Sequence, residues 1–266
     1  MIEVIAVHVP RAVAALGRAR FKDVLDPAKR ERVLRITRDE DRDRGAVADA
    51  LWRLAVARRL GERAPPAGFA ADRWGKLFLP DAPWLHFSVA HAGVWAVCAT
   101  GLAPLGVDVE CLQAISEESW AHLLSAEEAR DAHRFTGEDR RWLVCGLWTV
   151  KESFVNAIGV GWLTPPESLT VRKDGDGAFR LVGHRDAAQY KFRLYPLDGD
   201  HLVALCASAG KFPEAVERVE PAALSEMIAK TPTVWAPRHE GRSGERQAEK
   251  VGPRRPTAGR ARGTDR

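Results

Sequence analysis

The sequence predicts a globular protein that combines helices with strands and divides into two related halves. Its 266 residues, 45% of them hydrophobic, suffice for one large or two smaller domains. Segments with the two-residue period of strands occur beside segments with the longer period of helices. The stretch AVCA at residues 96–99 is echoed by ALCA at residues 204–207, each followed shortly by glycine. This echo suggests equivalent final strands in the two halves, although so short a match also arises by chance.

The first half, residues 1–101, is expected to form an N-terminal lobe. Asp26-Pro27 has the pattern of an N-cap followed by proline in the first helical turn. A longer helix is expected to end at Gly61, since glycine commonly follows the last helical residue. In chain order the expected elements are a strand at 2–9, a helix from Asp26-Pro27 to about residue 36, a helix at 39–60, an extended segment at 74–80 and a hairpin at 85–89 and 94–100 that turns at 91–93.

A glycine- and proline-containing segment at residues 100–104 marks the expected boundary with the second lobe, residues 102–212. Ser125 and Glu128 have the spacing of a capping box, which predicts a helix start between them. The expected elements are a strand at 106–110, helical segments at 116–135 with a break near Ser125, a helix at 138–158, and strands at 168–172, 179–182, 191–197 and 202–207, the first two joined by a turn at 174–177.

Residues 213–266 are expected to form a tail, largely disordered beyond about residue 237, because polar residues, glycine and proline leave little to bury there. Residues 211–266 hold 12 basic and 8 acidic residues, so residues 1–210 carry 28 of each and the whole net charge of +4 lies in the tail. The pI near 9.0 is therefore poor support for a nucleic-acid-binding surface, and no nucleic-acid partner is expected.

The four cysteines show no CxxC or Cys/His metal spacing, which favours structural thiols in a reducing cytoplasm. The first residues lack a basic segment followed by a long apolar one. Neither a secretory signal nor a membrane span is therefore expected.

Two acids in the segment GVDVE, residues 106–110, are the first candidates for chemistry. In a strand the two valines enter the core, while Asp108 and Glu110 project from the other face about 6.5–7 Å apart. A hard cation such as Mg²⁺ takes carboxylate oxygens at about 2.1 Å and leaves its other positions to water and phosphate. Glu152, on the helix at 138–158, is the candidate third ligand. Taken alone, the two acids fit a solvated strand face better than a metal site. The later helix with Glu152 reverses that preference in favour of the metal site.

Basic side chains around such a cation would complete a polyphosphate site, because they form charge-assisted hydrogen bonds with the remaining oxygens. Lys29 and Arg32 share a helix face, although any single cation fits a solvated surface better. The sequence contains no Walker loop, dinucleotide fingerprint, kinase motif, serine-hydrolase elbow or HExxH. Common NTPases, kinases, serine hydrolases and zinc peptidases therefore lose support.

The segment GVDVE, followed about forty residues later by WTVKESFVNAIGVG, resembles the paired signatures of the Sfp-type 4′-phosphopantetheinyl transferases. The family pattern is (I/V)G(I/V)D(I/V)E and then WxxKExxxKxxGxG. Upstream, WGK at residues 74–76 precedes HFSVAHAG at residues 86–93, where the family has an FNxSHSG-like segment. The resemblance covers about residues 1–210, and the tail has no counterpart in it.

The resemblance implies an α+β monomer of two similar lobes related by a pseudo-twofold axis, the 4′-phosphopantetheinyl transferase fold. It implies an enzyme of the holo-[acyl-carrier-protein] synthase type. Such enzymes transfer the 4′-phosphopantetheine group from coenzyme A to a serine of an acyl, aryl or peptidyl carrier protein, use Mg²⁺, and release adenosine 3′,5′-bisphosphate. Fatty-acid, polyketide and nonribosomal-peptide pathways all stay open. The alternatives are a non-catalytic homologue that binds carrier protein or coenzyme A, and another metal-assisted enzyme of a nucleotide or coenzyme A substrate.

Matching the motifs residue by residue implies a role for each candidate. Asp108, Glu110 and Glu152 would hold Mg²⁺ against the pyrophosphate. Glu152, directly or through a water, would also be the base for the carrier serine. Lys151 would stabilise charge near the transferred phosphate of coenzyme A. The remaining coenzyme A phosphates would be bound by Lys29, Arg32, Arg44, Lys76 and His91.

Three positions depart from the family pattern. Ala90 replaces the serine before the histidine, Gly45 a hydroxyl residue, and Asn156 a lysine. Each loses a polar partner, which costs about 1.5–3 kcal/mol where the partner is charged. We therefore expect retuned coenzyme A binding, with nearby arginines as candidate compensation.

Residues 112–124 follow the acidic strand and are a candidate docking segment for the carrier protein, with plain connecting structure as an equal alternative. Docking there predicts that alanine at Trp120 and Leu124 raises the KM for carrier protein and leaves that for coenzyme A unchanged.

Overall fold

The computed structural model describes residues 1–23, 25, 27–61, 69–161, 163–173 and 179–230. Three expectations lie outside the described residues: the N-cap at Asp26, the turn at 174–177 and the disordered tail beyond about residue 237. No helix within the described ranges is long and apolar enough to cross a membrane.

The N-terminal elements agree with the expected order and add two short helices. Helix α4 has the predicted bounds, with Asp39, Glu40 and Asp41 in its first turn, where acidic residues favour the helix dipole. Helices α1 and α2, of eight and six residues, were not expected. The elements are β1 (Glu3–His8), α1 (Val9–Leu16), α2 (Arg18–Asp23), α3 (Pro27–Leu34), α4 (Asp39–Leu60), β2 (Ala70–Ala71), β3 (Leu77–Phe78), β4 (His86–Ala92) and β5 (Trp95–Gly101).

The second part of the chain is built around one long helix, α7. The predicted capping box is confirmed, because Ser125 Oγ accepts from Glu128 N and Glu128 accepts from Ser125 N at the start of α6. The elements are β6 (Leu105–Cys111), α5 (Trp120–Leu123), α6 (Ala126–Ala132), α7 (Gly137–Ile158), β7 (Thr170–Lys173), β8 (Phe179–Val182), β9 (Lys191–Pro196), β10 (His201–Ala207), β11 (Glu217–Arg218) and α8 (Pro221–Lys230).

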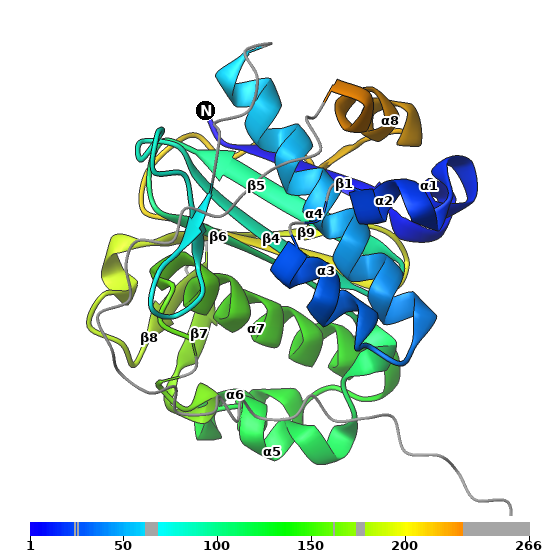
Figure 1. Cartoon of the computed structure of the whole chain (residues 1–266). Coiled ribbons are helices and arrows are strands. Elements are labelled where there is room, and N and C mark those ends of the chain that lie inside the picture. The colour runs from blue at the N-terminus through cyan, green and yellow to red at the C-terminus, as the bar shows by residue number, and fades with distance from the viewer. Residues whose placement is uncertain (24, 26, 62–68, 162, 174–178, 231–266) are drawn as a thin grey trace, which may run out of the picture.

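Two larger sheets lie between α4 and α7, and the α+β class is confirmed (Figure 1). One sheet has the strand order β11-β1-β5-β4, and the other has the order β6-β10-β9-β8-β7. The two strands with the echoed sequence, β5 and β10, are interior strands of different sheets, and both are buried throughout. A short hairpin of β2 and β3 stands apart from both sheets.

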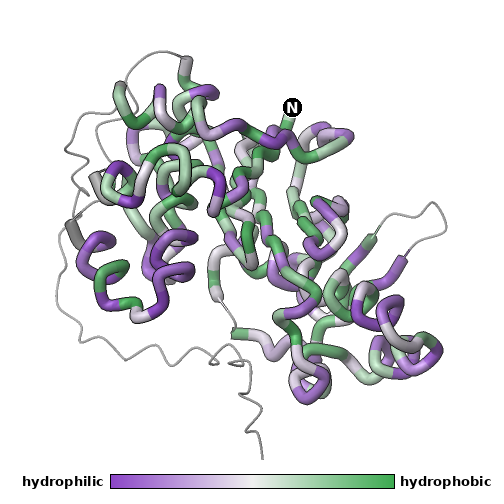
Figure 2. Tube along the Cα trace, turned by 90° about the vertical axis from the view of Figure 1, so that its right-hand side faces the viewer, coloured by the Kyte–Doolittle hydropathy of each residue, from purple (hydrophilic) through white to green (hydrophobic). Residues whose placement is uncertain are grey.

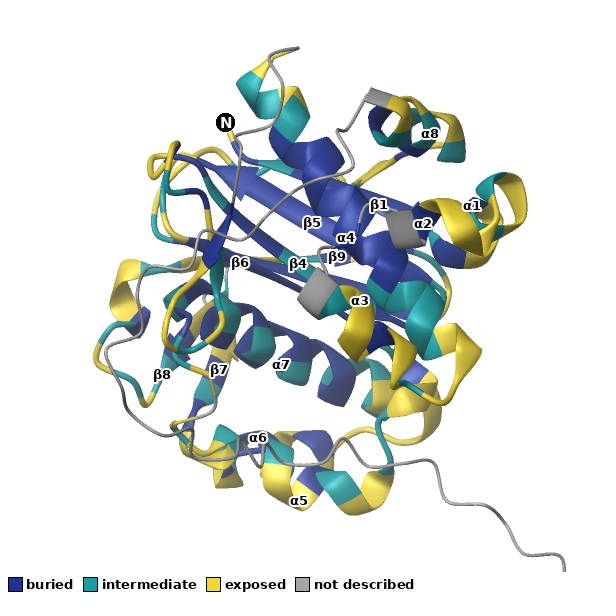
Figure 3. Cartoon of the chain, in the orientation of Figure 1, coloured by how far each residue is buried: buried dark blue, intermediate teal, exposed yellow. Residues whose placement is uncertain are grey.

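The core is layered because neighbouring residues of a strand face opposite sides. In β1, Ile5 and Val7 pack with α4, whereas Val4 and Ala6 join a core shared by both sheets. A third core lies between the second sheet and α7, with Phe154 at its centre. Figure 3 shows this burial along β1, β5 and the inner face of α4, and Figure 2 shows hydrophilic residues along the peripheral helices.

The chain after the second sheet returns to the first. Strand β11 pairs in parallel with β1, and Leu224 and Met227 of α8 are buried in the core beneath α4. Part of the segment expected as a tail, residues 213–266, is therefore structured up to residue 230. The lobe boundaries near residues 101 and 212 stay predictions.

Candidate functional site

Strand β6 presents its two acids toward α7. Leu105, Val107 and Val109 enter the core between the sheets, so the alternate residues face the opposite side. On that side a Cβ added at Gly106 would lie 2.1 Å from Ser153 O and 2.3 Å from Ala157 N of α7. Only glycine allows so close an approach of helix and strand, which explains the glycine of the GVDVE motif.

The acids Asp108 and Glu110 are 4% and 7% exposed. Trp148 of α7 donates from Nε1 to Glu110 Oε1 at 3.1 Å. Burial, together with the charges of Glu110 and Asp108, raises the pKa of the nearby Cys145 thiol to about 12. The two carboxylates therefore lie against α7, as the motif spacing predicts.

Glu152 lies one helical turn beyond Trp148 on α7 and is half-buried. Within the ranges that the structure describes, no three His, Cys, Asp or Glu side chains are gathered as a ready metal site. The close approach at Gly106 brings the helix of Glu152 to the strand of Asp108 and Glu110. The metal site formed by the three acids stays a prediction.

Lys151 makes its contacts on another side of α7, within a buried polar cluster. Its Nζ donates to Glu128 Oε2 at 2.6 Å, to Leu123 O at 2.7 Å and to Pro166 O at 3.0 Å, and the residue is fully buried. Burial lowers the pKa of Lys151, and the charge of Glu128 partly offsets that effect. Protein oxygens thus occupy three donor positions of the ammonium, and its expected contact with a transferred phosphate stays a prediction.

Glu128 holds several segments together through the same cluster. Besides Lys151 and Ser125 N, it accepts from Val171 N of β7 at 2.8 Å. The sequence indicates its capping role, but its pairing with Lys151 requires the fold, since 23 residues separate the two.

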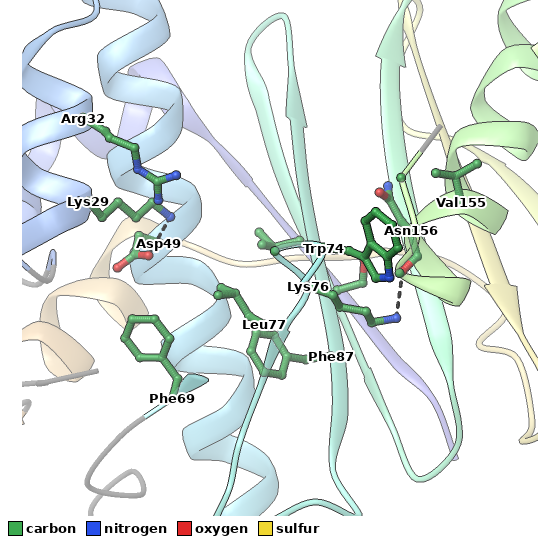
Figure 4. Close-up of a pocket in the computed structure, with 15 residues that line it drawn as sticks. Lys29, Arg32, Asp49, Phe69, Trp74, Lys76, Leu77, Phe87, Val155 and Asn156 are labelled. Atoms are coloured by element: carbon green, nitrogen blue, oxygen red, sulfur yellow. Dashed lines mark hydrogen bonds and ion pairs between the residues drawn. The ribbon is translucent and has the colours of Figure 1, made fainter. Parts of the chain in front are cut away.

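A cavity of about 370 Å³ lies beside the C-terminal end of α7 (Figure 4). Lys29 and Arg32 of α3 lie on one side of it, with Trp74 and Lys76 on the other, as Figure 4 shows. Its remaining lining includes Asp49, Phe69, Phe87, Ser88, Val155 and Asn156. The structure therefore brings together three of the predicted basic residues.

Asp49 of α4 anchors the basic wall of this cavity, and sequence reasoning missed it. Lys29 Nζ lies 2.7 Å from Asp49 Oδ1, and Arg53 Nε donates to Asp49 Oδ2 at 2.9 Å. Burial alone would raise the pKa of Asp49, but the charges of Lys29 and Arg53 lower it. The i, i+4 spacing of Asp49 and Arg53 on a helix was the available signal.

The ammonium group of Lys76 donates hydrogen bonds to three backbone carbonyls. Its Nζ donates to Ala157 O at 2.6 Å, to Asn156 O at 2.7 Å and to Leu105 O at 3.1 Å. Burial lowers the pKa of Lys76 to about 8. This residue lines the cavity, but its charge is directed to the ends of α7 and β6.

Arg44 and His91 lie outside the lining of this cavity. Arg44 Nη1 donates to Gly93 O at 2.9 Å, and Nη2 pairs with Asp41. His91 is half-buried on β4, opposite Ala96 of β5, and the turn begins at Gly93, two residues later than expected. His91 belongs to the end of the β4–β5 hairpin, and Arg44 of α4 is bonded to that end.

The comparisons with known proteins agree with the motif spacing. Residues 104–206 match the model of the 4′-phosphopantetheinyl transferase superfamily. The chain is 28% identical over 218 residues to 4′-phosphopantetheinyl transferase Sfp of Bacillus subtilis, which covers 82% of this chain and 97% of that protein. It is 30% identical over 164 residues to 4′-phosphopantetheinyl transferase psf-1 of Bacillus pumilus, covering 61% of this chain and 68% of that protein.

The chain belongs to the 4′-phosphopantetheinyl transferase superfamily. Its similarity to Sfp over most of both chains identifies it as an Sfp-type member. Among solved structures, a holo-(acyl-carrier-protein) synthase from Bacillus anthracis, in complex with CoA (3′,5′-ADP), has a TM-score of 0.35 and 21% identity. The matched region covers 39% of this chain and 93% of the Bacillus anthracis chain.

The three departures from the family pattern have local consequences in the structure. Asn156 donates from Nδ2 to Val107 O at 3.0 Å, so the residue in place of the family lysine ties α7 to β6. A Cβ at Gly45 would meet only Val33 Cγ2 at 3.8 Å, which leaves room for a side chain. Ala90 is half-buried on β4 opposite Val97.

The residues chosen to test the docking segment are part of the core. Trp120 and Leu124 are 7% and 5% exposed, and they pack in the cluster of Phe154. Their replacement by alanine would create cavities and destabilise the fold, so it cannot report on carrier binding. These two residues are therefore unsuitable for the substitution test, and the docking role of residues 112–124 stays a prediction.

Proposed function

We propose that this protein transfers the 4′-phosphopantetheine group of coenzyme A to a serine hydroxyl of a carrier protein, with Mg²⁺, releasing adenosine 3′,5′-bisphosphate. Family membership and one structural observation support this proposal. Gly106 lets α7 pack directly on β6, so the helix of Glu152 faces the buried acids Asp108 and Glu110. The cavity with Lys29 and Arg32 adjoins the same helix a turn later, at Val155 and Asn156.

The donor set fits a hard divalent cation. Asp108, Glu110 and Glu152 offer carboxylate oxygens, which Mg²⁺ prefers over nitrogen or sulfur ligands. Trp148 holds Glu110 Oε1 through its indole N–H, which restricts the orientation of that carboxylate. A Mg²⁺ held by these carboxylates would supply positive charge that offsets the negative charge of the phosphates.

The protein's own groups would supply positioning and proton transfer. Glu152, half-buried on α7, would accept the proton of the carrier serine, directly or through a water. Lys29 and Arg32 would bind phosphate oxygens of coenzyme A at the cavity, where Asp49 fixes the position of Lys29. Arg44 and His91 at the hairpin end, and Lys151 within its buried cluster, keep their proposed phosphate roles.

Several expectations belong to the same proposal. They are the pseudo-twofold relation of lobes 1–101 and 102–212, the monomeric state, the holo-[acyl-carrier-protein] synthase type, a cytoplasmic location, and acyl, aryl or peptidyl carrier proteins as partners. The interior positions of β5 and β10 in the two sheets support the relation of the lobes.

Intact-mass measurement of apo carrier proteins tests the function directly. With coenzyme A and Mg²⁺, the wild-type protein is expected to add the mass of phosphopantetheine to at least one carrier. Asp108→Ala and Glu152→Gln are expected to lower the rate by at least a hundredfold while circular dichroism shows an unchanged fold. Glu138→Gln, at the exposed start of α7, is the matched control and keeps the rate. Full transfer by Asp108→Ala would contradict the proposal.

Asn156 favours a second candidate, a non-catalytic homologue that binds coenzyme A or carrier protein. Its amide is committed to Val107 O, where the family pattern has a lysine. Binding of coenzyme A by calorimetry without any mass increase across a panel of carriers would support this second function. A mass increase on any carrier excludes it.

A further inference from the structure

Lys76 projects from a turn that is closed by hydrogen bonds of the Asp72 side chain and backbone. Asp72 Oδ1 accepts from Trp74 N at 2.8 Å and from Lys76 N at 2.9 Å. Asp72 N donates to Lys76 O at 2.9 Å, and Gly75 has a φ of +89°, which glycine adopts without strain. The start of the Lys76 side chain is therefore fixed in direction.

The ammonium of Lys76 meets the ends of two other elements. Asn156 O and Ala157 O belong to the last turn of α7, where carbonyls have no donor within the helix. A positive charge at this end also interacts favourably with the helix dipole. The third acceptor, Leu105 O, is the first carbonyl of β6. One side chain thus satisfies the end of the long helix and joins it to the acidic strand.

The absence of a side chain at Gly159 leaves room for the Lys76 side chain. Helix α7 ends at Gly159, which has a φ of +73°, and a Cβ there would lie 2.7 Å from Lys76 Cδ. A side chain at residue 159 would therefore displace the lysine stem. Both the left-handed C-cap and the path of Lys76 depend on this glycine.

The hydrogen bonds of Lys76 join two segments that line the same side of the cavity. Trp74, Gly75 and Lys76 line it from the turn, whereas Val155 and Asn156 line it from α7. Lys29 and Arg32 lie across from them, as Figure 4 shows. The distance between the turn and α7 is thus set by the two hydrogen bonds from Nζ to Asn156 O and Ala157 O.

We propose that Lys76 is a positioning residue that caps α7 and sets the width of the cavity, and that it does not bind the 3′-phosphate of coenzyme A. Its consequence for coenzyme A rests on the proposed function. The cap itself does not, because it is a property of the ligand-free chain.

Hydrogen exchange of the ligand-free, full-length protein tests the cap. Lys76→Met keeps the apolar stem and removes the donors, and it is expected to speed exchange of the amides of residues 155–159 at least tenfold. Lys76→Arg, which keeps the charge and donors, is expected to restore part of the protection. Arg73→Met is the matched control, because Arg73 is an exposed cation of the same turn that stacks on Trp74. If Lys76→Met fails to fold, Lys76→Gln replaces it. Unchanged exchange in the folded variant would overturn the proposal.

Ligand binding separates positioning from contact with the 3′-phosphate. Calorimetry with coenzyme A and with dephospho-coenzyme A, which lacks the 3′-phosphate, is expected to show that Lys76→Met weakens both by the same factor. Lys29→Met, on the opposite wall, is the comparison for a proposed phosphate ligand. A loss confined to coenzyme A would make Lys76 a phosphate ligand and overturn the proposal. If the wild-type protein binds neither compound, the proposed function fails while the exchange result still decides the cap.

Discussion

At the scale of single residues, Lys151 and Glu128 form a buried ion pair whose charged atoms are all hydrogen-bonded. Every charged oxygen or nitrogen of the pair has a donor or acceptor in the cluster that joins α7 to Leu123, Pro166 and Val171. The position of Glu152, the next residue along α7, therefore depends on an interaction that does not itself involve the proposed metal.

Replacement of Lys151 by methionine is expected to destabilise the protein by about 3–5 kcal/mol, because Glu128 would stay buried without its cation. Urea unfolding measures this loss. Glu127→Gln is the control. Glu127 lies beside Glu128 on α6, and its replacement removes only the exposed ion pair with Arg172 of β7, so stability is expected to change little. A double variant with both Lys151 and Glu128 replaced by methionine should recover part of the loss. Equal stability of Lys151→Met and wild type would show that the pair is not structural.

At the scale of elements, the packing of α7 on β6 is the feature on which the candidate site depends. It requires glycine at residue 106, whose Cα faces Ser153 O and Ala157 N without room for a methyl group. The acids that follow Gly106 on the same strand face owe their contact with α7 to this approach.

We expect Gly106→Ala to push α7 away from β6 and to lower the transfer rate at least tenfold, with a loss of stability of about 1–3 kcal/mol from overpacking. The measurements are the rate of carrier modification and urea unfolding. Gly146→Ala is the control on the helix side, because a Cβ there meets only the flexible ends of Leu194 at 3.3 Å and Leu202 at 3.6 Å. A fully active Gly106→Ala protein would mean that close packing is not needed for the site.

At the scale of the whole molecule, Asp198 connects the two sheets. It accepts from Trp95 Nε1 of β5 at 2.6 Å and lies 2.8 Å from His201 Nδ1 of β10. Burial alone would raise the pKa of Asp198, but hydrogen bonds from Asp200 N, Trp95 and His201 lower it to about 2.

Because this carboxylate has a pKa below its ordinary value of 3.8, its stabilising effect is complete above that pH and is lost as the pH falls toward 2. Asp198→Asn is therefore expected to cost about 2 kcal/mol at pH 7, and about half of that at pH 3. Urea unfolding at both pH values checks this. Asp200→Asn, on the same turn, is the control for a general charge effect. A difference that does not depend on pH would exclude the linkage.

Much of the fold follows from local patterns. The bounds of α4, the capping box at Ser125 and the strand of Asp108 were predictable because each depends on residues close in sequence. The short helices α1 and α2 were missed because they have only eight and six residues, about two turns each or less, which is too short for a clear helical period. The roles of Trp120 and Leu124 were misjudged because an amphipathic segment does not reveal which neighbours cover it.

By itself, the sequence determined the family, the α+β class and the strand face that carries the acids, because motifs and periodicity are properties of short segments. Only the tertiary structure decided which cations share the cavity, and that Lys151 and Lys76 are bonded to protein oxygens. Lys76 and Ala157 stand 81 residues apart, and Lys151 and Glu128 stand 23 apart. The direction of a charged side chain depends on which acceptors the fold brings within reach, and the chain order does not contain that information.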